Sequence, residues 1–101
     1  MGLVHDSLVD LIYGDLASKY DDVSQHVCYS RGELDILLIE GRRAIIIEIK
    51  SSNKKKNRTR AYQQLLTACN NYYAVKTKEF YGFYCYWTDK SHTKYGIERL
   101  I

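Results

Sequence analysis

With 101 residues, the sequence is long enough for one domain, residues 1–101, and too short for a second module. Its hydrophobic content of 46% excludes a disordered chain, and no apolar run is long enough to span a bilayer. The net charge of +3 is too small to indicate a polyanionic partner by itself. The N-terminus lacks the pattern of a secretory signal, and the three scattered cysteines share no metal-ligand spacing. We therefore expect a cytoplasmic protein with reduced core thiols.

The first predicted element is a helix over residues 3–20, whose apolar side chains share one stripe: Val4, Leu8, Leu11 and Ile12. Residues 23–29 suit a short strand. Residues 34–39 alternate, with Leu34, Ile36 and Leu38 on one face and Asp35, Leu37 and Ile39 on the other. Residues 44–50 form a β-branched strand, and the Glu40-Gly41-Arg42 segment between the two strands predicts a tight hairpin turn.

The second half continues with a polar, basic loop over residues 51–57 and a helix over residues 58–75. The expected buried stripe of this helix is Ala61, Leu65, Ala68 and Tyr72. Residues 80–87 are apolar on both faces, as in a strand covered on both sides, and residues 95–101 are a candidate last strand. The order αβββαβ, with one further strand, predicts an α/β fold with a mixed central sheet flanked by helices.

Three charged residues, Asp35, Glu48 and Lys50, stand inside these apolar strands, where an isolated charge is costly. Glu48 and Lys50 are two residues apart and so leave the same face of their strand. A turn at Gly41 would place Asp35 opposite Glu48 near the open end of the hairpin. Two carboxylates in that arrangement can share one divalent cation, to which the carbonyl of Ile49 could add an oxygen.

These residue types suit phosphodiester hydrolysis, which needs an activated water and neutralisation of the charge that develops at phosphorus. Mg²⁺ takes oxygen ligands and lowers the pKa of a bound water. The ammonium of Lys50 could orient that water or stabilise the transition state. The alternative is structural: Glu48 and Lys50 would lie on an exposed face and form ordinary ion pairs.

At these residues the chain resembles the PD-(D/E)XK nuclease superfamily. The resemblance is carried by three stretches, Gly32–Ile39, Ala44–Ile47 and Glu48-Ile49-Lys50-Ser51-Ser52, and covers residues 3–75. It is nearest to archaeal Holliday junction resolvases and small viral nucleases. It implies a restriction-endonuclease-like αβββαβ core, and a Mg²⁺-dependent DNA endonuclease in which Mn²⁺ can substitute. By the same resemblance the substrate would be branched or structured DNA and the protein a homodimer.

Three alternatives stay open at this point. One is an exonuclease or nicking enzyme with the same site. Another is a nucleic-acid-binding module whose site is degenerate. The third is a small structural protein without DNA affinity.

The sequence departs from the superfamily pattern at two positions. Leu34 replaces the usual proline, and His5 aligns with the glutamate that the first helix often carries. His5 is either a metal or phosphate ligand or a surface residue, and Asp15 is a weaker substitute. Glu33 could reach the metal, or it could be a solvated turn residue.

The resemblance also implies a glutamine that assists the site from the second helix. Helical spacing places Gln64 on the inner stripe and Gln63 on the polar face, so we assign this role to Gln64. The alternative for Gln64 is a buried amide bonded to the backbone.

Charge is distributed unevenly along the chain. Residues 1–40 hold eight acids and two bases, whereas residues 41–101 hold four acids and thirteen bases. This asymmetry indicates a polyanionic partner, here DNA, bound through its phosphates. The expected contacts are Lys54, Lys55, Lys56, Arg58, Arg60 and Arg31, with Arg42 and Arg43 as extensions. A merely solubilising loop is the alternative.

Overall fold

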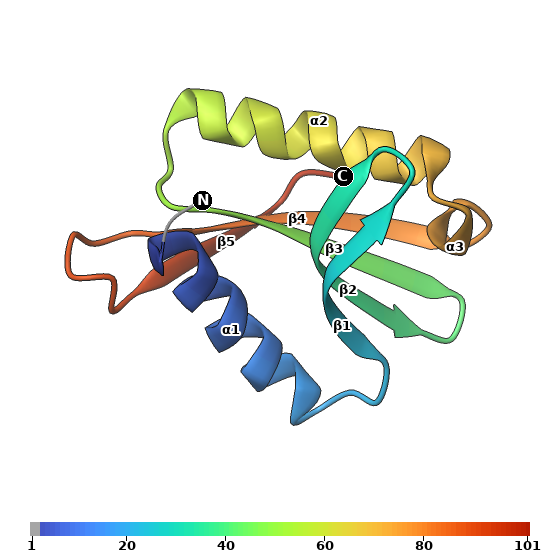
Figure 1. Cartoon of the computed structure of the whole chain (residues 1–101), viewed down its shortest axis with the longest axis horizontal. Helices are drawn as coiled ribbons and strands as arrows, with labels where there is room; N and C mark the ends of the chain where they lie inside the picture. The colour runs from blue at the N-terminus through green and yellow to red at the C-terminus, as the bar shows by residue number, and fades with distance from the viewer. Residues whose placement is uncertain (1–2) are drawn as a thin grey trace.

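The chain folds into a five-stranded mixed sheet with one long helix on each face (Figure 1). A computed structural model describes residues 3–101. Its elements are α1 (Leu3–Ala17), β1 (Val23–Tyr29), β2 (Gly32–Glu40), β3 (Arg43–Lys50), α2 (Lys55–Asn71), α3 (Tyr73–Lys76), β4 (Glu79–Trp87) and β5 (Tyr95–Arg99). The expected α/β class and element order are confirmed. The second helix begins and ends earlier than expected, since α2 starts at Lys55 and the short α3 follows it.

The strands lie in the order β1-β2-β3-β4-β5. Neighbouring pairs are antiparallel except β3 and β4, which are parallel because α2 carries the chain back across the sheet between them. The parallel pair extends from Arg43↔Glu79 to Lys50↔Tyr86. Strand β3 is therefore the middle strand, and its last residues, which include Glu48, lie within the sheet and not at its edge.

Two apolar cores lie on opposite faces of the sheet. On the α1 face, Leu8, Val9 and Ile12 pack against strand residues such as Ile47 and Ile49. On the α2 face, Leu65 and Ala68 pack against strand residues that include Leu37, Ala44 and Ile46. Alternation along β3 produces this division, because odd-numbered side chains face α1 and even-numbered ones face α2. Leu11, expected on the buried stripe, is instead 42% exposed.

The expected alternation of β2 breaks at Asp35. Leu34 packs into the α2-side core and Ile36 into the α1-side core, although they are two positions apart in a strand and should share a face. The β1–β2 ladder is interrupted at the same place: Gln25 pairs with Ile36 and Val27 with Leu34, and His26 between them has a φ of 54°. The prediction that Leu34 and Ile36 share a face is therefore wrong. Asp35 lies at this break, between two side chains that pack on opposite faces of the sheet, at the position where a functional side chain was expected.

The expectation that all three cysteines are buried in the core is only partly confirmed. All three are free thiols, but only Cys85 is buried, while Cys69 is half-buried and Cys28 is exposed. The expected core thiols are thus confirmed for Cys85 alone. No helix in the described part of the chain has the length and apolar character needed to cross a membrane.

Candidate active site at the open end of the β2–β3 hairpin

Asp35 and Glu48 meet where the β2–β3 hairpin opens. The last pair of the ladder is Ile36↔Ile47, so Asp35 and Glu48 are the next residues on their two strands. Both are buried, with Asp35 8% and Glu48 1% exposed. The expected opposition of the two acids across the hairpin is confirmed. Packing on both faces of the sheet holds this register, because a slip by one residue would exchange the β3 side chains that pack against α1 with those that pack against α2.

Asp35 is held by contacts from two elements. Its Oδ2 accepts a hydrogen bond of 2.8 Å from the backbone N–H of Ile49 and lies 3.3 Å from Nε2 of His5. His5 also lies 3.1 Å from Asp6, through its Nδ1. The hydrogen bond with Asp35 raises the pKa of His5 above its ordinary value, while burial opposes the rise. His5 therefore belongs to the site and is not the plain surface residue that was the alternative.

Glu48 has a buried carboxylate oxygen, Oε2, without a hydrogen-bond partner among residues 3–101. Burial, followed by the negative charge of Asp35, raises the pKa of Glu48 well above its ordinary value, while the positive charge of Lys50 lowers it. A buried polar group without a partner costs about 1–3 kcal/mol, and a charged group costs more. This oxygen therefore needs a proton or a cation.

Lys50 points to α2 and does not pair with Glu48. Its Nζ donates a 2.7 Å hydrogen bond to Oε1 of Gln64. Over the residues that the structure covers, no ion pair joins Lys50 to a carboxylate, which argues against the simple ion-pair alternative. Gln64 is exposed, so its expected place on the buried stripe and the alternative of a buried amide are both wrong. Gln64 nevertheless reaches the site from the edge of that stripe.

Other candidate ligands lie apart from this cluster. Glu33 is exposed, and its Oε2 is 2.9 Å from Nδ1 of His26. Asp15 is exposed near the end of α1, whereas His5 lies in its first turn. Ile49 contributes its N–H to the site, and a role for its carbonyl stays a prediction. Within residues 3–101, no group of three or more His, Cys, Asp or Glu side chains has the arrangement of a metal site.

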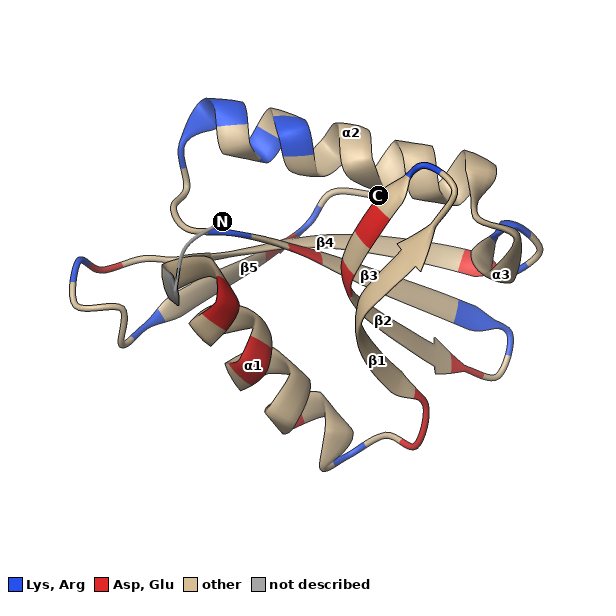
Figure 2. Ribbon diagram, in the orientation of Figure 1, with Lys and Arg blue, Asp and Glu red and all other residues tan. Residues whose placement is uncertain are grey.

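An open cleft of about 650 Å³ lies at the end of β3, where His5 and Lys50 line it and the buried Asp35 and Glu48 do not. Its lining includes His5, Lys50, Lys54 and Arg60, so most of its charge is positive. Figure 2 shows basic residues on the first turns of α2, next to this cleft, and acidic residues along α1. All six predicted DNA contacts are exposed: Arg31, Lys54, Lys55, Lys56, Arg58 and Arg60.

The structure bears on the expected DNA contacts of three arginines, Arg58, Arg42 and Arg43. Arg58 is partly neutralised, because its guanidinium forms an ion pair of 2.5 Å with Glu98 of β5, which no local pattern in the sequence indicated. Arg42 and Arg43 lie at the opposite end of β3 from Lys50, a separation of roughly 23 Å at 3.3 Å per strand residue. They do not line the cleft, and a contact of either residue with bound DNA stays a prediction.

Three residues that position the site were missed from the sequence. The hydroxyl of Tyr84 donates 2.7 Å to the carbonyl of Ser52, and Asn57 donates 3.1 Å to the same carbonyl, which fixes the loop after Lys50. Trp87 donates from its indole to the carbonyl of Val4 at 3.0 Å, which anchors the start of α1 beside His5. Tyr84 and Trp87 gave no local signal, because each acts on a segment distant in sequence, whereas Asn57 acts on a residue only five positions earlier. Neither a comparison with protein-family models nor one with curated proteins finds a match for this sequence.

Proposed function

We propose that this chain is a Mg²⁺- or Mn²⁺-dependent DNA endonuclease with a PD-(D/E)XK-type site in a restriction-endonuclease-like core. The observation that supports it most directly is Oε2 of Glu48, buried without a partner beside Asp35 and two residues before Lys50, which lines a basic cleft. Hard divalent cations prefer carboxylate oxygens, so this donor set fits Mg²⁺. When bound, the cation supplies positive charge to the phosphate and lowers the pKa of a coordinated water.

In this proposal Asp35 and Glu48 hold the cation, with the carbonyl of Ile49 as a further oxygen. His5 and the N–H of Ile49 fix Oδ2 of Asp35, so the carboxylate keeps its orientation when DNA enters. Lys50 presents its ammonium to the phosphate and stabilises the negative charge that develops there. Gln64 accepts a hydrogen bond from Lys50 and so positions the ammonium at the cleft.

The exposed basic residues around the cleft bind the DNA backbone in this proposal. Phosphate contacts of this kind give affinity without reading sequence, so binding should weaken steeply with salt. A branched or otherwise structured DNA substrate and a homodimer complete the proposal and rest on the resemblance to the resolvases. The proposed cytoplasmic location rests on the three free cysteines.

The test is incubation of the protein with four-way junction, flap, duplex, single-stranded and closed circular DNA, with Mg²⁺, Mn²⁺ or EDTA. We expect metal-dependent cleavage that is lost in Glu48→Ala and kept in Glu40→Ala, a matched loss of charge at the other end of β2. Cutting of the closed circle would exclude an exonuclease. Binding without cleavage in either metal would favour the binding module, and absence of any affinity at low salt would contradict both.

A further inference from the structure

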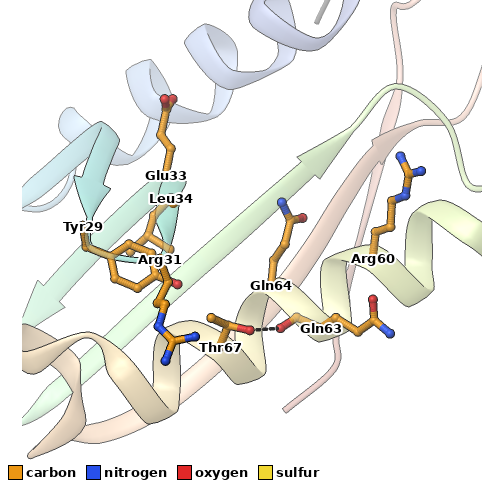
Figure 3. Close-up of a pocket in the computed structure, with 9 residues that line it drawn as sticks. Tyr29, Arg31, Glu33, Leu34, Arg60, Gln63, Gln64 and Thr67 are labelled. Atoms are coloured by element: carbon orange, nitrogen blue, oxygen red, sulfur yellow. Dashed lines mark hydrogen bonds between the residues drawn. The ribbon is translucent and has the colours of Figure 1, made fainter.

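A second, smaller pocket lies next to the cleft, between the β1–β2 turn and α2. Its volume is about 240 Å³. Arg31 stands on the turn side, Gln63 and Gln64 on the α2 side, and Tyr29 and Leu34 supply apolar surface (Figure 3). Small-molecule pockets generally measure roughly 300–1,000 Å³, so this one suits a group no larger than a single nucleotide.

The pocket adjoins the basic cleft and contacts Gln64, the hydrogen-bond partner of Lys50. Arg60 lines both the pocket and the cleft that contains Lys50. Gln64 also lines the pocket, and its amide oxygen is the acceptor for the ammonium of Lys50. A DNA strand that passes Lys50 in the cleft would therefore meet this pocket within a short distance.

The guanidinium groups of the pocket are available to a ligand. Across residues 3–101, neither Arg31 nor Arg60 forms an ion pair, whereas Arg58 pairs with Glu98. Glu33, the one acid of the lining, pairs with His26, and its side chain points away from the other labelled residues in Figure 3. The pocket thus has two guanidinium groups and no competing carboxylate directed into it, which suits a phosphate.

The rest of the lining matches a nucleobase. Tyr29 offers an aromatic ring, itself packed on Tyr72 with ring centroids 5.1 Å apart, and Leu34 is 1% exposed beneath it. Aromatic rings stack on unpaired bases of any sequence, and side-chain amides such as that of Gln63 can bond to a base edge. A base inside a paired duplex cannot enter a pocket of this size.

We infer that this pocket is a subsite for one unpaired nucleotide, with its base against Tyr29 and its phosphate on Arg31, while Arg60 lies on the side towards the cleft. The inference rests on the proposed function, because it names the DNA that the same cleft takes. It adds a structural cause for a preference for branched or bulged DNA over continuous duplex.

The experiment measures binding in EDTA by fluorescence anisotropy, so that it does not depend on cleavage. Three DNAs of one sequence are compared: a duplex, the duplex with a one-nucleotide bulge, and the same bulge with an abasic unit. We expect the wild type to prefer the bulge over duplex by roughly tenfold, the scale of one base stacked on an aromatic ring. The abasic unit should lose most of that preference.

Variants then assign the preference to the pocket. In Arg31→Ala and Gln63→Ala the ratio of bulge to duplex affinity should fall towards one, whereas Arg42→Ala, at the far end of β3, should keep the wild-type ratio. Both altered pocket positions are accessible from solvent, and circular dichroism confirms folding of each variant. Equal affinity of the wild type for bulge and duplex would overturn the inference, as would a ratio unchanged in both pocket variants.

Cleavage in Mg²⁺, measured separately, distinguishes this inference from the proposed function. Preference for the bulge without cleavage would support the nucleotide subsite and contradict the nuclease. Cleavage of duplex and bulge alike, with equal affinity for the two, would support the nuclease and contradict the subsite.

Discussion

Glu48→Gln should stabilise the metal-free protein. In the wild type, Oε2 of Glu48 is buried without a partner, and the neighbouring charge of Asp35 opposes ionisation of Glu48. The glutamine side chain has nearly the same shape, removes one of two like charges and brings an amide that can donate a hydrogen bond. Relief of one unsatisfied buried group is worth about 1–3 kcal/mol. For a domain of this size, each kcal/mol shifts Tm by roughly 4–8 °C, so Tm should rise by at least about 4 °C in EDTA.

The same variant should lose the response to metal. If the two carboxylates hold a cation, Mg²⁺ at 100 times its Kd stabilises the wild type by about 2.7 kcal/mol and the variant far less. Thermal unfolding followed by circular dichroism, in EDTA and over a Mg²⁺ or Mn²⁺ titration, measures both effects. Glu40→Gln is the matched control, because it removes an exposed acid from β2, the neighbouring strand, at the opposite end of the hairpin from Glu48. The reasoning would be refuted if Glu48→Gln unfolded at a lower temperature than the wild type in EDTA. It would also be refuted if metal raised the Tm of the variant as much as that of the wild type.

Three further predictions follow from other contacts. Lys50→Ala should reduce the cleavage rate roughly 100-fold, which is the usual effect of removing one hydrogen-bond donor that stabilises charge in a transition state. DNA affinity, measured by fluorescence anisotropy, should fall less. Cys28 should react with a thiol reagent in the folded protein, while Cys85, whose thiol pKa burial raises to about 12, should react only on unfolding, as mass spectrometry would show. Hydrogen bonds led by the Thr93 hydroxyl lower the pKa of Asp89 to about 2 from 3.8, so its stabilising contribution is present above pH 3.8 and lost as pH falls to about 2. An NMR titration of the Asp89 carboxyl checks this, and a pKa near 3.8 in the wild type, or unchanged in Thr93→Val, would contradict it.

The hairpin at the centre of the site could be predicted because its signals are local. A turn at Gly41, with φ of 59°, and apolar alternation on both flanking strands suffice to pair Ile36 with Ile47. The meeting of Asp35 and Glu48 then follows from counting residues on each side of the turn. Helical spacing likewise identified most of the buried residues of α1 and α2, since burial on one face is what produces that spacing.

Features that depend on contacts between distant segments could not be predicted in the same way. The partner of Arg58 is Glu98, forty residues later, and only the placement of β5 beside β4 brings the two together. The orientation of Asp35 depends on an interruption of the β1–β2 ladder at His26, whose left-handed backbone no local motif required. Sequence patterns report the average environment of an element, whereas these features are departures from it.

Stability alone gives no reason for an acid at Glu48. The side chain is in the middle strand, 1% exposed, and its neighbours on that face include Ile46 and the apolar residues of α2. A well-packed apolar residue at such a position is often neutral or stabilising compared with a buried charge. The hairpin register nevertheless places this carboxylate beside that of Asp35. The free energy gained by packing β2 against β3 therefore holds two mutually repelling carboxylates together. A bound cation would convert that repulsion into shared ligation, which is why the metal-free stability of Glu48→Gln and its response to Mg²⁺ should change in opposite directions.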